Sequence, residues 1–389
     1  MSFGPWWRVS EPLIPYGRQW IDDDDIAAVA SVLRSDYLTT GPAVDNFEQA
    51  LEAVTGASRA VALNSGTSAL HAMYFGAGLG PGDEVITTPL TFAATANAAL
   101  YLGATVRFVD VLADTGNIDP GAVEAAIVPR TRLVVAVDYA GHPADYDALS
   151  DVTSQRGVTL LADAAHSLGA TYRGRPVGRL AAASELSFHP VKPITTGEGG
   201  AVITDDEELA DRVARFRTHG ITRDPEVMER DDGAWHYEQH DLGFNYRLTD
   251  LHAALGTSQL RRLGAFLARR RAIADRYLEQ LGDLDMLTLP EVRQDVEPGW
   301  HLFVVRVAEA SRRRPFFDRL REHGLGVQVH YIPVHHHPYY RRLGFAPGTC
   351  PIAEDYSARA ISLPIFPQMS DDEVDRVISA VRMAARDIL

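Results

Sequence analysis

Short β-rich runs alternate with helical segments along the first 247 residues of the chain. The runs span residues 60–64, 84–88, 106–111, 132–139, 158–163 and 185–189. Between them lie stretches with apolar positions at helical spacing, such as 67–80 and 91–104. This alternation is typical of βαβ units, in which helices cover both faces of a mostly parallel sheet. We therefore expect residues 1–247 to form one large α/β domain.

The pattern changes after residue 247. Residues 248–281 keep apolar positions at helical spacing with no internal proline, which predicts one long helix that links two domains. A strand, a helix, a second strand and a closing amphipathic helix are then expected at 300–307, 313–324, 327–332 and from Ser370. This mixture predicts a smaller α+β domain, so that the linking helix and the small domain together span 248–389.

Two segments stand outside this alternation. The chain starts with an irregular, aromatic stretch, and residues 22–36 then predict a helix with acidic residues in its first turn, where they suit the helix dipole. Residues 220–245 form the longest stretch without clear periodicity. Long loops inside compact domains are usually functional or disordered, so this loop is a candidate for function.

Composition mainly excludes classes of protein. The 389 residues, 46% of them hydrophobic, are enough for a large core. A net charge of -15 with scattered arginines offers no basic stripe, so no nucleic-acid partner is expected. One cysteine, Cys350, permits no intrachain disulfide, and neither a signal-peptide layout nor a membrane-spanning run is evident. We therefore expect a cytoplasmic protein without a membrane partner.

Lys192 is the only lysine among 37 basic residues. Arginine is always charged, whereas a buried lysine can lose its proton and form a Schiff base with a carbonyl group. Lys192 is therefore a candidate covalent anchor. The alternative is a chain with a strong arginine bias in which one surface lysine survived by accident.

Several polar residues follow the predicted strands, where ligands gather in open α/β sheets. The turn formed by residues 64–68 places backbone N–H groups at a helix start, which favours a phosphate but is also an ordinary helix cap. Asp163 ends a nearly apolar strand and precedes His166 by three residues. A buried acid there needs a partner, unless it simply caps the next helix.

Two further strand ends complete the set. Ser187 and His189 lead into the turn that carries Lys192, and Phe92 follows a strand near a helix start, where a ring is either core or a stacking platform. A lysine for an aldehyde, an acid for a pyridinium nitrogen, a helix start for a phosphate and a ring for stacking are what pyridoxal 5'-phosphate (PLP) requires. The combination indicates a PLP site.

Longer stretches resemble the DegT/DnrJ/EryC1/StrS family of nucleotide-sugar aminotransferases. They include NSGTSALHAM, LADAAHSLGA, SFHPVKPITTGEGGAV and DLGFNYRLTDLHAAL, and the resemblance runs from about residue 14 to the C-terminus. It implies the PLP-dependent transferase fold type I. Within the family, IPYGRQ, LTTGP and GVQVHY are most similar to the UDP-4-amino-4,6-dideoxy-N-acetyl-β-L-altrosamine transaminases of pseudaminic acid synthesis. The 4-amino-4-deoxy-arabinose transaminases of lipid A modification are the next most similar group.

The resemblance implies a role for each matching residue. Lys192 would form the Schiff base and shuttle protons, Asp163 would pair with the pyridine nitrogen, and His166 would lie near the phenolic oxygen. The other implied cofactor contacts are Gly66, Thr67, Ser68 and Ser187 at the phosphate, Phe92 on the ring, and Asn245 from the neighbouring subunit. A homodimer with shared active sites follows. The implied substrate contacts are Tyr16, Thr39, Thr40, Thr88, His189, Arg247 and His330.

The implied reaction moves an amino group from an amino acid, expected to be L-glutamate, onto the cofactor as pyridoxamine 5'-phosphate. The amino group then passes to the C4 keto group of a nucleotide-diphosphate sugar of the UDP-4-keto-6-deoxy-N-acetylhexosamine type. A lysine at position 192 argues against the 3-dehydratases of the family, which carry histidine there. The alternatives are a dTDP-keto-sugar aminotransferase of natural-product biosynthesis, a fold type I enzyme acting on amino acids, and a non-catalytic PLP-binding regulator. No G-x-G-x-x-G follows the first strand, which excludes a nicotinamide-dependent dehydrogenase.

Four histidines, His330, His335, His336 and His337, lie within eight residues. They invite a metal site, but no carboxylate or cysteine lies at ligand spacing in the sequence, so no metal is expected. The resemblance places His330 near the sugar pocket, and a buried structural histidine is the alternative.

Overall fold

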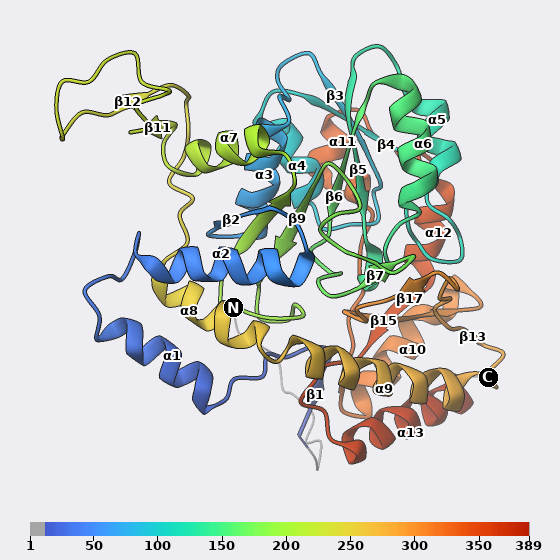
Figure 1. The fold of residues 1–389 in the computed structure, drawn as a ribbon. Coiled ribbons are helices and arrows are strands. Elements are labelled where there is room, and N and C mark those ends of the chain that lie inside the picture. Colours follow the sequence, from blue (N-terminus) through green and yellow to red (C-terminus); the bar gives the residue numbers. More distant parts are fainter. Residues whose placement is uncertain (1–11, 389) are drawn as a thin grey trace.

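The computed structural model describes residues 12–388, and its centre is a seven-stranded sheet (Figure 1). The strand order is β2-β10-β9-β6-β5-β3-β4. The bounds are β2 Arg59–Leu63, β3 Glu84–Thr87, β4 Thr105–Phe108, β5 Thr131–Val137, β6 Thr159–Asp163, β9 Ala183–Ser187 and β10 Gly200–Thr204. Only β10 runs antiparallel to its neighbours, so the predicted mostly parallel sheet is confirmed. The sequence prediction missed β10, which returns directly after the Lys192 turn without an intervening helix.

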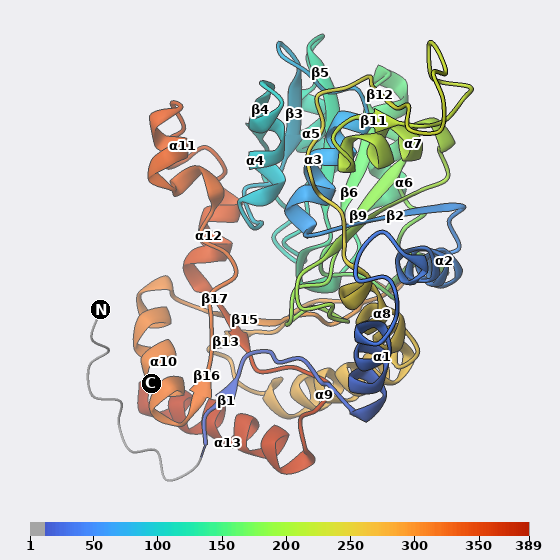
Figure 2. The same ribbon diagram turned by 90° about the vertical axis from the view of Figure 1, so that its left-hand side faces the viewer.

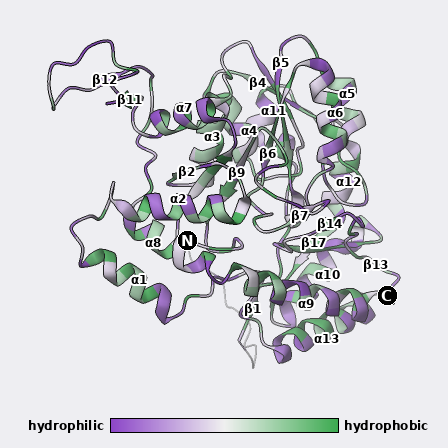
Figure 3. Ribbon diagram, in the orientation of Figure 1, coloured by the Kyte–Doolittle hydropathy of each residue, from purple (hydrophilic) through white to green (hydrophobic). Residues whose placement is uncertain are grey.

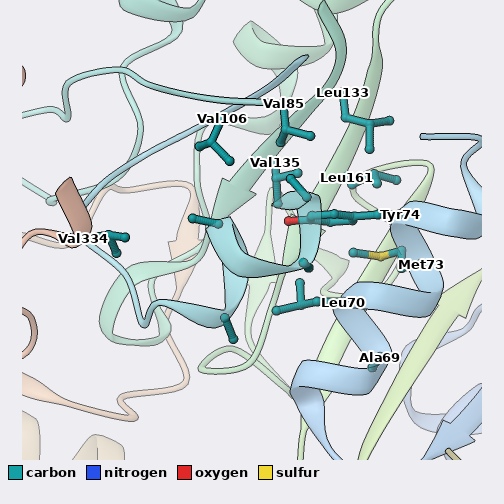
Figure 4. Packing of buried hydrophobic residues seen from close by; sticks show 14 of the residues in the cluster. Ala69, Leu70, Met73, Tyr74, Val85, Val106, Leu133, Val135, Leu161 and Val334 are labelled. Atoms are coloured by element: carbon teal, nitrogen blue, oxygen red, sulfur yellow. The ribbon is translucent and has the colours of Figure 1, made fainter. Parts of the chain in front are cut away.

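Helices cover both faces of this sheet because its strands alternate their buried side chains between two cores. On β5, Leu133 and Val135 belong to one core, and Val134 and Ala136 to the other. The first face is covered by α3 (Gly66–Gly76), α4 (Ala94–Tyr101) and α7 (Glu207–Arg217), and the second by α2 (Pro42–Thr55), α5 (Pro120–Ala126), α6 (Tyr146–Arg156) and α8 (Asp250–Leu260). Figure 4 shows the first core, where Tyr74 of α3 lies against the sheet.

The smaller α+β unit lies below the sheet in Figure 2. Its strands β13 (Leu287–Thr288), β15 (Phe303–Val307) and β17 (Ala360–Leu363) form an antiparallel sheet, packed with α9 (Leu263–Leu281), α10 (Ala310–Glu322) and α13 (Asp371–Ile388) around a third core. Hydrophilic and hydrophobic residues alternate along α13, as predicted for an amphipathic closing helix (Figure 3). A parallel pair joins β1 (Ile14–Pro15) to β16 (Leu325–Gly326).

Short elements complete the chain. They are α1 (Asp23–Leu33), α11 (Pro338–Arg342), α12 (Pro351–Arg359), the 3-10 turns η1 (Tyr139–Gly141) and η2 (Val334–His336), and the strands β7 (Thr171–Tyr172), β8 (Arg175–Pro176), β11 (Ile221–Thr222), β12 (Glu238–Gln239) and β14 (Val296–Glu297). No helix in residues 12–388 has the length and apolar content that a bilayer crossing demands. The aromatic start of the chain lies outside the described residues.

Two predicted elements were wrong. The single helix expected over 248–281 is divided into α8 and α9 by a turn at Arg261 and Arg262. The cause is tertiary, because the Arg262 guanidinium binds Asp22 and Asp25 beside α1. The strand expected over 327–332 is irregular.

The irregular segment is anchored mainly by side chains of the surrounding chain. One bridge joins Gln328 to Ser362, and the Ser362 hydroxyl also lies 2.7 Å from Nδ1 of His330. The hydroxyl of Tyr139 donates to the carbonyl oxygen of His330. These contacts replace a strand ladder and bring His330 and Tyr331 to the edge of the large sheet.

Candidate active site

A cavity of about 430 Å³ opens where β6 and β9 end. Ten of the predicted site residues line it, namely Tyr16, Gly66, Thr67, Phe92, Asp163, His166, Ser187, His189, Lys192 and His330. These residues come from segments far apart in the sequence, so the fold assembles the cavity at the predicted edge of the sheet.

Lys192 lies in the turn after β9, where its backbone N–H donates to the carbonyl oxygen of His189 at 2.9 Å. Desolvation in the cavity lowers the pKa of the amine to about 8, although the nearby Asp163 and Glu185 favour the charged form. The amine is therefore much closer to neutral at physiological pH than an exposed lysine. This is the state that a nucleophilic or proton-carrying lysine needs.

Asp163 is buried at the end of β6 and does not begin a helix. The Thr95 hydroxyl donates to its Oδ2 atom at 2.6 Å, and the backbone N–H of Ala165 donates to Oδ1 at 3.3 Å. These two donors hold the carboxyl group of Asp163 in a fixed orientation at the cavity wall.

His166 is buried beside Asp163, and its Nε2 atom lies 3.0 Å from the Tyr331 hydroxyl. Desolvation, followed by the charges of Lys192 and His330, lowers its pKa well below the usual value, so the ring is neutral. Its Nδ1 atom has no hydrogen-bond partner among the described residues. A buried ring nitrogen without a partner indicates a contact with a ligand.

The first turn of α3 forms a cradle for an anion. Ser65 caps the helix, and its side chain and that of Ser68 each accept a backbone N–H of the other. Gly66 and Thr67 follow the cap, and their N–H groups point out of the helix start, where none has an intrahelical acceptor. Ser187 faces this turn, since a side chain at Gly66 would place its Cβ 3.1 Å from the Ser187 hydroxyl. Ser68 itself does not line the cavity.

Aromatic side chains surround the cavity mouth. Phe92 is 63% exposed, with its ring 6.4 Å from that of Tyr331. The rings of Tyr16 and His330 lie 5.1 Å apart. Desolvation, with the charge of Lys192, lowers the pKa of His330 to about 4, so this histidine is neutral. Phe92 therefore offers an open ring face, and His330 offers a polar but uncharged one.

The remaining predicted residues lie elsewhere in the single chain. Thr88 is buried, and its hydroxyl accepts the N–H of Leu90. Thr40 and Arg247 line a second cavity of about 380 Å³ with Arg217. Beside this second cavity, Thr39 pairs with Thr249, and Asn245 pairs with Thr218. None of these residues lines the Lys192 cavity.

Sequence reasoning missed polar residues that line the cavity, namely Thr91, Glu185, Glu198, His301 and Tyr331. It also missed Thr95, which lies outside the lining and holds Asp163. Glu185 could have been found, because it lies two residues before Ser187 and therefore on the same side of β9. Tyr331 could not, because its segment was expected to be a strand.

The histidines of residues 330–337 lie in two different places in the structure: His330 lines the Lys192 cavity, whereas His335 and His336 lie beside Glu354. His335 is buried, and its Nε2 atom lies 2.8 Å from Oε1 of Glu354, while Nε2 of His336 lies 3.5 Å from Oε2 of the same residue. Their ligand atoms lie close enough to hold a metal ion. The Glu354 carboxylate, however, also accepts two hydrogen bonds from the N–H of Gly348. Its contacts therefore fix the loop before α12.

The described residues fit PLP. The cavity offers a lysine with a lowered pKa, a buried carboxylate, a neutral histidine with a free ring nitrogen, and an anion cradle at a helix start. With a mostly parallel sheet and a smaller α+β unit, these groups define a PLP-dependent enzyme of fold type I.

Comparison with known proteins identifies the family. The model of the DegT/DnrJ/EryC1/StrS aminotransferase family matches residues 19–382, and the chain belongs to this family. The spore coat polysaccharide biosynthesis protein SpsC of Bacillus subtilis is 42% identical over 374 residues, which cover 95% of this chain and 96% of SpsC. The predicted family is confirmed, and the protein is a PLP-dependent sugar aminotransferase.

Solved structures agree with this assignment. PseC of Helicobacter pylori, an aminotransferase involved in the biosynthesis of pseudoaminic acid, is 33% identical with a TM-score of 0.90, and the match covers 96% of this chain and 100% of PseC. Spr1654 of Streptococcus pneumoniae in its PMP form is 32% identical with a TM-score of 0.92, covering 97% of this chain and 100% of Spr1654.

Proposed function

We propose that the protein transfers the amino group of L-glutamate to the C4 keto group of a nucleotide-diphosphate sugar of the UDP-4-keto-6-deoxy-N-acetylhexosamine type. The observation that carries this proposal is the lining of the Lys192 cavity. Beyond the cofactor contacts it offers Tyr16, His189 and His330, which can hydrogen-bond sugar hydroxyl groups. The similarity to PseC supports the same substrate class.

The same lining disfavours an amino-acid acceptor. No arginine lies among the described residues that form the cavity wall. An enzyme that aminates free keto acids needs a cation, usually a bidentate arginine, for the substrate carboxylate. Neutral His330 suits a hydroxyl group better than a carboxylate.

Each cavity residue has a role in this proposal. Lys192 anchors the cofactor and moves a proton between its own amine and the reacting carbon atoms, for which a pKa near 8 suits both uptake and return. Asp163, held by Thr95, keeps the ring nitrogen protonated. When bound, the cofactor supplies an electron sink for the negative charge that develops on the reacting carbon.

The surrounding residues position the reactants. Gly66 and Thr67, with Ser187, hold the phosphate, and Phe92 stacks on the ring. Neutral His166 lies at the phenolic oxygen, where its free Nδ1 atom or the ring face makes the contact. Tight positioning of this kind converts binding energy into rate.

We further propose a homodimer with shared active sites. Four predicted site residues lie at or beside the second cavity and not around Lys192, namely Thr39, Thr40, Asn245 and Arg247. In a dimer, these residues would contact the active site of the partner subunit. Asn245 would reach the phosphate and Arg247 the anionic substrate of the partner subunit. The loop with β11 and β12 projects from the body in Figure 1, and Trp235 on it is 74% exposed. An exposed tryptophan on a projecting loop favours a protein contact.

The location and the test follow from the reaction. We place the enzyme in the cytoplasm, where nucleotide sugars and glutamate are available. The purified protein should show visible cofactor absorbance that glutamate bleaches. The bleached enzyme should recover its colour with a UDP-4-keto-6-deoxy-N-acetylhexosamine. Recovery only with a dTDP-keto sugar or with keto acids would overturn the substrate assignment.

The single lysine gives a direct check of the anchor. Borohydride reduction of the coloured enzyme should fix the cofactor to Lys192, because the chain has no other lysine side chain. Peptide mass spectrometry reads the site. A label at any other residue would contradict the assignment of Lys192.

A further inference from the structure

Glu185 is a buried acid that the proposed reaction does not use. It lies on β9, is 1% exposed and lines the Lys192 cavity. Neither of its carboxyl oxygens has a hydrogen-bond donor among the described residues. The other buried glutamate of the sheet, Glu84, receives hydrogen bonds from two arginines and a threonine. A buried carboxylate without donors is costly, so Glu185 needs a physical explanation.

The position of Glu185 places it between two parts of the cofactor site. On the neighbouring strand β6, Asp163 pairs with Glu185 in the parallel register. On its other side lies the anion cradle, since a Cβ atom at Gly66 would come within 2.4 Å of Oε1 of Glu185. An ionised Glu185 would therefore repel both the Asp163 carboxylate and a bound phosphate.

The protonation of Glu185 resolves this conflict. Burial, and then the charge of Asp163, raises its pKa well above the usual value, while Lys192 favours the ionised form. Tyr74 of α3 is a further titratable group in range, and the antiparallel strand β10 contributes the apolar Val202. As a neutral acid, Glu185 gains an O–H group, and the carboxylate of Asp163 is the acceptor at hand.

We propose that Glu185 is a positioning residue of the cofactor site, which donates its carboxylic O–H to Asp163 and leaves the cradle at Gly66 free of competing negative charge. The proposal rests on the seating of the cofactor proposed above. Asp163 then has side-chain donors from Thr95 and Glu185, which fix the orientation of its carboxyl group. A carboxyl group held in one orientation is preorganised to pair with the ring nitrogen.

Three variants test this role. Glu185→Gln keeps a neutral donor, Glu185→Leu removes it, and Glu84→Gln is the matched control at the other end of the sheet. The dissociation constant of PLP is measured by titrating cofactor-free protein and following visible absorbance. We expect Glu185→Gln to stay within about threefold of the parent and Glu185→Leu to bind roughly tenfold more weakly, as for a lost bond to a charged group. Glu84→Gln should bind PLP like the parent.

Spectroscopy separates positioning from folding. The infrared carbonyl band of a protonated carboxylic acid should be present in the parent and absent in Glu185→Gln, and the pH at which the visible absorbance changes should shift only in Glu185→Leu. Thermal unfolding of each cofactor-free variant shows that the protein is folded.

Three results would overturn the proposal. Equal weakening in Glu185→Gln and Glu185→Leu would mean that the site uses the ionised carboxylate. Parent-like binding and absorbance in Glu185→Leu would mean that Glu185 has no positioning role. If the infrared band persists in Glu185→Gln, Glu185 is not its source. Parent protein that binds PLP without a bond to Lys192 would instead refute the proposed seating of the cofactor.

Discussion

The central sheet buries one glutamate near the amino ends of its parallel strands and another near their carboxyl ends, and the two differ in their hydrogen bonds. At the amino end of β3, the Glu84 carboxylate accepts hydrogen bonds from Arg107 at 3.1 Å, Arg130 at 2.8 Å and Thr131 at 3.0 Å. In the middle of β9, Glu185 faces the cavity at the carboxyl ends of the strands and has no donor among the described residues. The amino end satisfies its charge within the protein, whereas the carboxyl end leaves groups for a ligand. Buried polar atoms without hydrogen-bond partners, in an otherwise well-packed sheet, therefore indicate where the active site lies.

The largest expected effect lies at the carboxyl end. Lys192→Ala removes both the anchor and the proton carrier, so amino transfer should fall by roughly a thousandfold or more. The measurement is single-turnover bleaching by glutamate. Thermal unfolding of the cofactor-free protein should change little, because Lys192 faces a cavity. Substantial amino transfer by Lys192→Ala would show that the carboxyl end of the sheet does not depend on Lys192 for the reaction.

Asp163→Asn should have the next largest effect. A neutral amide cannot hold the ring nitrogen in its protonated form as a carboxylate does, so the rate of the same half-reaction should drop by about a hundredfold. Thr95 can still bond the amide oxygen, which keeps the geometry. If Asp163→Asn reacts as fast as the parent, Asp163 is not the partner of the ring nitrogen.

At the amino end, Glu84→Gln should cost stability instead of activity. Loss of charge-assisted bonds from Arg107 and Arg130 should lower the free energy of unfolding by about 1–3 kcal/mol. Denaturant titration measures this loss, and the rate per folded molecule should equal that of the parent. If Glu84→Gln instead reacts more slowly and keeps the parent's free energy of unfolding, Glu84 serves the reaction and not the stability of the fold.

The two glutamates should also give opposite pH dependences. Burial alone would raise the pKa of Glu84, but Arg107, Thr131 and Arg130 together lower it. Its contribution to stability is present above its unfolded pKa and is lost as pH falls through the lowered value. The deficit of Glu84→Gln relative to the parent should therefore be full at pH 7 and shrink in acid.

For Glu185 the sign is reversed. Its raised pKa means that the folded protein holds a proton that the unfolded chain releases, so stability declines as pH rises above the unfolded pKa. Glu185→Gln should therefore gain stability relative to the parent as the pH rises above the unfolded pKa of glutamate. The unfolding midpoints of the cofactor-free proteins, measured as a function of pH, test both predictions. If the stability of Glu84→Gln and of Glu185→Gln relative to the parent changes with pH in the same direction, the predicted difference between the two glutamates is wrong.

The smallest expected effect is on PLP affinity and tests the hydrogen bond from Thr95 to Asp163. Thr95→Val removes one hydroxyl donor at 2.6 Å and keeps the side-chain shape. We expect a loss of about 1 kcal/mol, or roughly fivefold, in PLP affinity. Thr87→Val is the control, because within residues 12–388 the Thr87 hydroxyl bonds only to the Val135 carbonyl oxygen of the sheet. Equal losses in both variants would show a packing effect.

Much of the fold could be predicted from the sequence, because alternating apolar strands and helices of ordinary spacing leave few arrangements. The failures have tertiary causes. The break between α8 and α9 depends on the contact of Arg262 with Asp22 and Asp25, which no local pattern reveals. The segment after β16 looked like a strand because Val327, Gln328 and Val329 alternate, but side-chain anchors hold it instead.

The site was predictable where a residue carries its own signal. Lys192 was conspicuous as the only lysine, and Asp163 as an acid that ends an apolar strand. Thr95 and Tyr331 carry no such signal, because threonine and tyrosine are ordinary in helices and loops. Their roles come only from distances to Asp163 and His166 in the folded chain.

Gly66 shows how one position can limit another on a different element. Its backbone does not require glycine through a positive φ angle, yet an added Cβ atom would come within 2.4 Å of the Glu185 carboxyl group. The side chain at position 185 therefore limits position 66 to glycine, and the Cβ and Oγ atoms of Ser187, each 3.1 Å from the added atom, limit it further. During sequence divergence, a larger residue at 66 requires a shorter side chain at 185 and a shift of Ser187, so these three positions are expected to change together.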